Sequence, residues 1–273
     1  MNRIDARFKA LAAARRTGLI PFVTAGCPGP TATVPVLHAL VAGGADLIEI
    51  GVPFSDPMAD GPVIQKASEH ALAQGVGLTR VLAMVAEFRV SDGDTPIVLM
   101  GYLNPVEIYG HARFAADAQR AGVDGVLLVD APVEEAGEIR AGLAAAGIAQ
   151  IFLVAPTTRS ARLQQVAQAA SGFIYYVSFA GITGADHLAV GDVAQHVADL
   201  RAQSRIPIAV GFGVKEPAQS AAIGAFADAV VIGSALVERL AHSPSDAAAA
   251  EVARAFIAAH RQALDRAAVA AAA

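Results

Sequence analysis

The chain has 273 residues but only one cysteine, Cys27, no tryptophan, and charged side chains at only 16% of positions. A single cysteine excludes an internal disulfide and a metal site built from cysteines. There are 20 Lys and Arg residues and 25 Asp and Glu residues, so the net charge is −5. Without a basic cluster, the sequence predicts no binding to nucleic acid or to an anionic membrane. No apolar run approaches the length of a membrane span.

The first 18 residues, MNRIDARFKALAAARRTG, lack the apolar core of a secretory signal. Ile4, Phe8 and Leu11 recur at helical spacing, which predicts a short amphipathic helix within residues 1–16. From these features we expect a cytoplasmic protein.

Short apolar runs alternate with helical stretches along the whole chain, without a linker or a break in composition. Several runs are almost continuously aliphatic, as in strands that are buried on both faces. The predicted strands are 19–24, 46–51, 96–100, 125–129, 150–154, 173–178, 207–211 and 229–233. The predicted helices between and after them include 133–146, 193–203, 217–225 and 245–273. Eight such units indicate an α/β fold, a single (β/α)8 TIM barrel over residues 1–273, with a frayed Ala-rich tail at 265–273.

The main alternative is an open doubly wound sheet, which usually carries a glycine fingerprint after its first strand. Here that turn reads AGCPGP at 25–30, which does not match. A second pattern recurs along the chain: Ala-Gly-Gly-Ala-Asp at 42–46 and Ala-Gly-Val-Asp at 121–124 each end a helix just before a strand. We interpret this pattern as a structural repeat of the helix-to-strand return.

Acidic residues stand out on the second strand and in the loop after it, because active sites of such barrels lie at the carboxyl ends of the strands. Alternation along the strand places Glu49 on the same face as Leu47 and Gly51, in an apolar setting that would raise its pKa. The loop that follows carries Asp56 and Asp60 with Gly and Pro hinges. Glu49 could instead be a structural group bonded to a neighbouring strand, and the two aspartates could simply form turns.

Glycine-rich segments follow the sixth, seventh and eighth strands, and Gly233-Ser234 opens a helix. Backbone N–H groups at such a place bind phosphate, although tight turns alone would also require glycine.

Lysine occurs only at Lys9, Lys66 and Lys215, none in a strand, so a Schiff-base mechanism has no well-placed amine. The histidines form no metal-ligand pair at a strand end, and we expect no metal.

Several segments then resemble the tryptophan synthase alpha chain family, in order over nearly the whole chain. They are LIPFVTAG at 19–26, EIGVPFSDPMADGPVIQ at 49–65, MGYLNP at 100–105, DAPVEE at 130–135, YVSFAGITG at 176–184 and GFG at 211–213. The stretch 49–65 is highly specific. The resemblance implies a (β/α)8 barrel and a carbon–carbon lyase of tryptophan biosynthesis that splits indole-3-glycerol phosphate into indole and glyceraldehyde 3-phosphate.

The resemblance also implies roles for individual residues. Glu49 would act as the acid and base at the indole carbon and the glycerol hydroxyl, and Asp60 would accept the indole N–H, with Thr183 bonding this aspartate on loop closure. The residues that would surround the substrate are Phe22, Tyr102, Leu127, Tyr175, Thr183 and Phe212. Those of the phosphate site would be Gly184, Gly213, Gly233 and Ser234.

A beta chain that carries pyridoxal phosphate is the implied partner, in an α2β2 complex, so the cofactor would belong to the partner. Pro53, Asp56 and Asn104 match the partner-facing side. Phe179 stands where the family often has arginine, which bears on loop closure. Three alternatives stay open: a stand-alone lyase, a phosphate-binding barrel isomerase, and a non-catalytic activator of a beta chain.

Overall fold

A computed structural model of the chain describes residues 2–178, 190–211 and 213–272. Its eight parallel strands close into one barrel in the order β1 to β8, each strand pairing with the next and β8 with β1. The strands are β1 (Gly18–Thr24), β2 (Ile48–Gly51), β3 (Ile97–Gly101), β4 (Gly125–Leu128), β5 (Ala149–Val154), β6 (Ile174–Val177), β7 (Ile208–Gly211) and β8 (Ala229–Ile232). All eight predicted strands are confirmed to within two residues, and so is the barrel.

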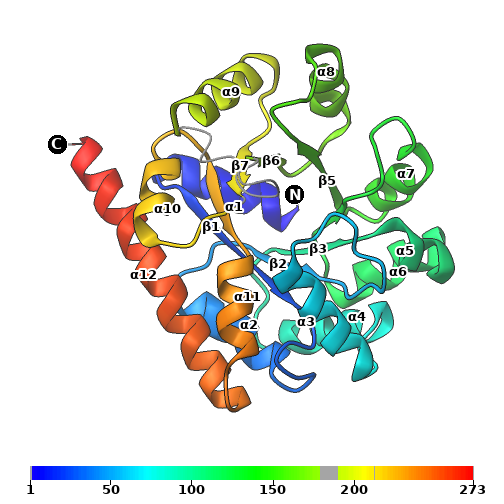
Figure 1. Cartoon of the computed structure of the whole chain (residues 1–273). Coiled ribbons are helices and arrows are strands. Elements are labelled where there is room, and N and C mark those ends of the chain that lie inside the picture. The colour runs from blue at the N-terminus through cyan, green and yellow to red at the C-terminus, as the bar shows by residue number, and fades with distance from the viewer. Residues whose placement is uncertain (1, 179–189, 212, 273) are drawn as a thin grey trace.

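The helices surround the barrel on its outside, except α1, which lies across one end of it (Figure 1). They are α1 (Arg3–Ala13), α2 (Thr33–Ala42), α3 (Pro62–Ala73), α4 (Leu78–Arg89), α5 (Leu103–Tyr109), α6 (His111–Ala121), α7 (Gly137–Ala145), α8 (Ser160–Ala169), α9 (Val190–Gln203), α10 (Pro217–Gly224), α11 (Ser234–Ala241) and α12 (Asp246–Ala272). The helix predicted at 133–146 begins four residues late, because residues 133–136 form a turn closed on the carbonyl of Pro132. Helix α12 includes most of the Ala-rich tail, whose fraying stays a prediction.

The ends of the helices follow the local sequence. Gly122 has φ +88° and Gly147 φ +71°, the left-handed conformation that closes a helix at low cost only for glycine. Glu216 and Gln219 form a reciprocal capping box ahead of α10, with Pro217 in its first turn. These signals set where the chain turns back toward each strand.

Helix α1 closes the amino end of the barrel. Its buried residues Ile4, Phe8 and Leu11 belong to the same apolar cluster as the inward-facing Leu47 and Leu127 of the barrel. The outward-facing strand residues pack instead against the outer helices, in a separate and larger cluster. The barrel interior is therefore a filled core and not a channel, and an active site in such a barrel lies at its carboxyl end.

Four equivalent contacts tie the strands together at the amino end, and we call them the rim clamps. In each, a residue just before an even-numbered strand donates its backbone N–H to the carbonyl of a residue on the preceding odd-numbered strand. Its side-chain oxygen accepts the N–H of that same residue, and all eight bonds measure 2.8–3.0 Å. The pairs are Asp46 with Leu19, Asp124 with Ile97, Ser171 with Gln150, and Asp228 with Ile208. Two of the four clamp residues, Asp46 and Asp124, end the Ala-Gly…Asp repeat found in the sequence.

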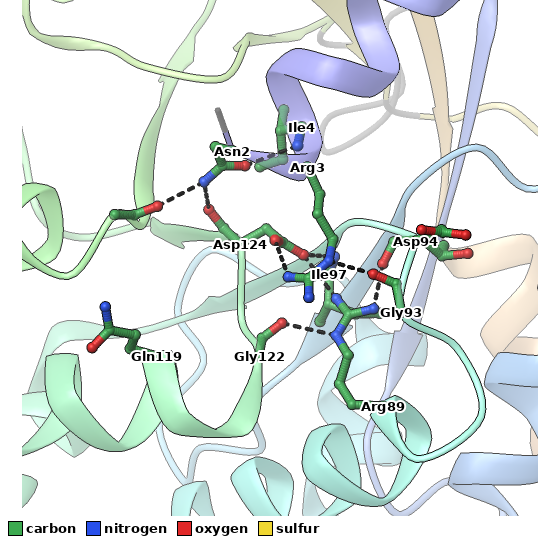
Figure 2. A network of polar contacts seen from close by, with 12 residues as sticks. Asn2, Arg3, Ile4, Arg89, Gly93, Asp94, Ile97, Gln119, Gly122 and Asp124 are labelled. Carbon is green, nitrogen blue, oxygen red and sulfur yellow. Dashed lines mark hydrogen bonds and ion pairs between the residues drawn. The ribbon is translucent and has the colours of Figure 1, made fainter.

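Arginines neutralise the aspartates of the rim clamps. Figure 2 shows Asp124 between Arg3 of α1 and Arg89 of α4, with both ion pairs at 2.8 Å. The Asn2 amide donates to the carbonyl of Asp124 at 2.8 Å, which fixes the start of α1 to the same point. Asp46 similarly pairs with Arg16 at 2.9 Å. The amino end is thus a hydrogen-bonded and charge-paired base for the barrel.

Within the part of the chain that the structure describes, no single helix has the length and apolar character needed to cross a membrane. Helices α3 and α4 meet that test only when taken together, and the two are bent by 93°.

Candidate active site

Glu49 lies on β2 beside Phe22 of β1 and Val98 of β3. Its side chain is 0% exposed, and neither carboxylate oxygen has a hydrogen-bond partner among the described residues. Burial raises the pKa of Glu49 from its usual 4.5 to about 8. A carboxyl group without partners is costly to bury in its ionised form, so Glu49 is a neutral acid at pH 7. The predicted alternative, a structural bond to a neighbouring strand, is not observed among these residues.

Two aromatic residues predicted to line the site surround Glu49. Tyr175 of β6 is buried, and desolvation together with the Glu49 carboxylate raises the pKa of its hydroxyl well above the usual value. A Cβ on Gly211 would collide with the Tyr175 hydroxyl, and a Cβ on Gly51 would lie 2.5 Å from the Phe22 ring. Glycine at these strand ends therefore makes room for the two rings. Leu127 of β4 is fully buried in the same interior.

Asp60 belongs to the loop after β2, and Tyr102 holds it. The Tyr102 hydroxyl donates to Asp60 Oδ2 at 3.2 Å and accepts the backbone N–H of Ala59 at 3.0 Å. Burial raises the pKa of Asp60 to about 6, although the bond from Tyr102 acts to lower it. The two carboxyl groups therefore differ in protonation at pH 7: Asp60 is largely ionised, and Glu49 largely protonated. When the surroundings give two carboxyl groups different pKa values, the two groups can take separate acid and base roles.

Three of the residues predicted for a phosphate, Gly213, Gly233 and Ser234, lie after β7 and β8, at the same end of the barrel. Ser234 is the first residue of α11 and Gly233 is its N-cap, so the free N–H groups of the first helical turn point toward this end. Gly213 has φ +76°, a conformation suited to glycine. The predicted Thr183, Gly184 and Phe212, and also Phe179, lie outside the described residues.

A groove of about 1150 Å3 lies beside the loop after β2, and we call it the loop-side groove. Pro53 and Asn104 of the predicted partner surface line it, and Asp56 is exposed one residue beyond the lining Ser55. Ile108, which is 81% exposed, also lines the groove.

Sequence reasoning missed some residues that shape the site. The Gln65 amide donates to the carbonyl of Asp60 at 2.8 Å, and the Phe54 ring stacks 5.1 Å from that of Tyr102. The buried hydroxyl of Thr24, at the carboxyl end of β1, has no hydrogen-bond partner among the described residues. Only the Gln65 bond had a signal in the sequence: Gly61-Pro62 starts a helix, and Gln65 lies in its first turn, five residues after Asp60. No group of three or more potential metal ligands occurs in the described ranges.

Comparisons with known proteins identify relatives over nearly the full length. The family model of the tryptophan synthase alpha chain matches residues 8–268. The tryptophan synthase alpha chain of Laribacter hongkongensis is 58% identical over 265 residues, which cover 97% of this chain and 100% of the relative. That of Xylella fastidiosa strain M12 is 57% identical, covering 97% and 99%.

Solved structures show the same similarity. The tryptophan synthase subunit alpha from Legionella pneumophila str. Paris superposes with a TM-score of 0.90 at 42% identity, covering 97% of this chain and 99% of that one. A chain of the M. tuberculosis tryptophan synthase, in an aminoacrylate-bound form, gives a TM-score of 0.85 at 34% identity, covering 97% and 100%. The resemblance inferred from the motifs is therefore confirmed, and the chain belongs to the tryptophan synthase alpha chain family.

Proposed function

We propose that this chain is a lyase that cleaves indole-3-glycerol phosphate into indole and glyceraldehyde 3-phosphate, with Glu49 and Asp60 as its catalytic pair. The observation that carries the proposal is the fully buried Glu49, whose carboxylate oxygens have no partner among the described residues, below a loop on which Tyr102 holds Asp60. Burial raises the pKa of both groups, of Glu49 to about 8 and of Asp60 to about 6. The reaction requires a proton donor at a ring carbon and an anion near the ring nitrogen, and these two groups meet those needs at neutral pH.

Glu49 supplies the proton. Its neutral carboxyl group protonates the indole carbon that bears the glycerol chain, and the resulting carboxylate removes the proton of the adjacent glycerol hydroxyl. The carbon–carbon bond then breaks, its electron pair returns to the ring, and the hydroxyl carbon becomes an aldehyde. Glu49 ends the cycle protonated again. Neither an amine nor a metal takes part in these steps.

Asp60 stabilises the charge that this protonation creates. Adding a proton to the ring carbon makes the ring cationic, and a carboxylate that accepts the indole N–H lowers the energy of that intermediate. The Tyr102 hydroxyl keeps Asp60 in place through the bond at 3.2 Å. Phe22, Leu127 and Tyr175 supply apolar walls for a bicyclic ring. The phosphate binds at the start of α11, so its binding energy orients the reacting end.

Indole release from indole-3-glycerol phosphate by the purified chain tests this assignment. We expect Glu49→Gln to lower kcat by about 100-fold or more, because the amide keeps the shape but transfers no proton. Asp60→Asn should lower kcat as well. The matched control is Glu69→Gln, an exposed glutamate on α3, which should keep the wild-type rate. A Glu49→Gln variant with wild-type turnover would refute the mechanism.

We further propose that the loop-side groove binds a beta chain in an α2β2 complex. The exposed Ile108 and the neighbouring Pro53 and Asn104 support this partner surface, and pyridoxal phosphate would belong to the beta chain. The cytoplasm is the proposed location, because the first 18 residues lack the apolar core of a secretory signal.

A charge at the proposed partner surface tests the complex. Ile108→Lys should weaken binding of a beta chain and remove any rate increase that the beta chain causes. Val269→Lys is the control, because Val269 is 71% exposed and lies on α12, which contributes no residue to the groove. Equal effects of the two variants would argue against this surface. No response of the wild-type rate to a beta chain would favour a stand-alone lyase.

A further inference from the structure

A second hollow lies at the amino end of the barrel, opposite the candidate active site. It has a volume of about 540 Å3, within the range of small-molecule sites, and it lies between the ends of α1, α9 and α10. Thr17, Pro207 and Asp228, which immediately precede strands β1, β7 and β8, border it. We call it the basal hollow, and neither the proposed reaction nor the partner surface uses it.

Four arginines line the basal hollow, against one acidic residue, in a chain whose net charge is −5. Two of the four have partners: Arg201 pairs with Asp228 at 2.8 Å, and Arg16 pairs with Asp46 at 2.9 Å. Arg15 and Arg205 form no ion pair and no side-chain hydrogen bond with any described residue. The hollow therefore contains two guanidinium groups with unused donors.

Helix ends explain part of this charge but not all of it. The C-termini of α1 and α9 meet here, and basic residues near a helix C-terminus favourably oppose its partial negative charge. Arg201, in the last turn of α9, meets that need. Arg15 instead occupies the position after the α1 cap with φ +50°, and it is the only non-glycine residue with positive φ in the described chain. Glycine is usual at such a position, so an arginine there costs backbone energy for no observed contact.

Apolar residues form part of the wall of the hollow. Ile206, Pro207 and Phe226 line it and are only half-buried, so part of each residue remains accessible there. A hollow lined by both charged donors and apolar groups matches a ligand that has both an anionic group and an apolar body. Inorganic anions alone would leave the apolar walls uncovered.

We propose that the basal hollow binds a small organic anion, a phosphate or carboxylate on an apolar body, through Arg15 and Arg205. Arginine forms two parallel hydrogen bonds to either anionic group, and these charge-assisted bonds are stronger than neutral ones. Ile206, Pro207 and Phe226 contact the apolar body.

Isothermal titration calorimetry at low ionic strength tests the proposal, with phenyl phosphate, benzoate, inorganic phosphate and neutral benzyl alcohol as probes. We expect phenyl phosphate or benzoate to bind more tightly than inorganic phosphate and benzyl alcohol. The probe that binds better identifies the anionic group. The double variant Arg15→Gly/Arg205→Gln should bind it about tenfold more weakly or worse.

The variants separate this site from others. Arg15→Gly introduces a residue that suits the left-handed backbone, so the melting temperature should not fall because of that substitution. Arg140→Gln, an exposed arginine on α7 without an ion pair to any described residue, is the matched control and should bind like the wild type. The double variant keeps any anion binding at the candidate active site. Only the binding that the wild type shows and the double variant lacks therefore belongs to the basal hollow. Unchanged binding in the double variant, equal binding of benzyl alcohol, or no binding of either organic anion would overturn the proposal.

Discussion

The two ends of the barrel treat buried carboxylates in opposite ways. At the amino end, Asp124 is 3% exposed, yet it accepts a backbone N–H and pairs with both Arg3 and Arg89. At the carboxyl end, Glu49 is 0% exposed and neither oxygen has a partner among the described residues. Burial alone therefore does not distinguish a structural carboxylate from a catalytic one. The difference lies in the surrounding donors, which stabilise the charge in one place and leave proton chemistry open in the other.

Removing the paired carboxylate should have the largest effect on stability. Asp124→Ala leaves the N–H of Ile97 without its acceptor and removes the anion that pairs with Arg89, which keeps only its bonds to backbone carbonyls and the more distant Asp92. We therefore expect a loss of about 3–5 kcal/mol of unfolding free energy. Urea unfolding measures this loss. Activity per folded molecule should stay at the wild-type level, because Asp124 lies at the opposite end from Glu49. Asp199→Ala, an exposed aspartate on α9, is the control. A loss no larger than that of the control would remove the contrast between the ends.

Removing the unpaired carboxylate should act in the opposite direction. The folded state favours protonated Glu49 up to about pH 8, whereas the unfolded chain ionises near 4.5. Wild-type stability therefore falls as pH rises through this window, and Glu49→Gln, which cannot ionise, should avoid that loss. At pH 8.5 we expect the variant to be more stable, on the order of 3 kcal/mol, with the advantage fading toward pH 4.5. Urea unfolding at both pH values would contradict this if the variant were the less stable protein at pH 8.5.

The pH dependence of kcat/KM should sharpen the assignment of the two catalytic groups. Activity requires ionised Asp60 and protonated Glu49, so it should fall below about pH 6 and above about pH 8, about tenfold for each further pH unit. Steady-state rates of indole release measure this profile. In Asp60→Asn the acid limb should disappear while the alkaline limb remains. Persistence of the acid limb in that variant would assign it to another group.

The smallest effect should come from the rim clamp without charge. Ser171 gives the N–H of Gln150 a neutral acceptor at 2.9 Å, where the other three clamps use aspartate. Ser171→Ala should therefore cost only about 1 kcal/mol of unfolding free energy, the usual worth of a neutral hydrogen bond. Urea unfolding measures this cost, and Ser160→Ala, at an exposed serine on α8, is the control. A cost as large as that of Asp124→Ala would mean that geometry and not charge determines clamp strength.

The sequence predicted the strands well because buried parallel strands are short apolar runs between helix ends marked by glycine. Glu49 could be found in the same way, as a carboxylate at an inward position of such a run. The bond between Tyr102 and Asp60 could not, since it joins residues 42 apart through the course of a loop. Ser171 and Asp228 lacked the Ala-Gly signal that marked Asp46 and Asp124. The arginines of the basal hollow come from separate helices, and only the fold brings them together.

The rim clamps divide the molecule into four modules, because each clamp joins an odd strand to the even strand that follows it and none joins β2 to β3, β4 to β5, or β6 to β7. A chain cut between β4 and β5 would leave every clamp inside one fragment, whereas a cut between β3 and β4 would divide the Asp124 clamp between two. Fragments cut between β4 and β5 should each keep their rim clamps. They should therefore reassemble more readily than fragments cut between β3 and β4.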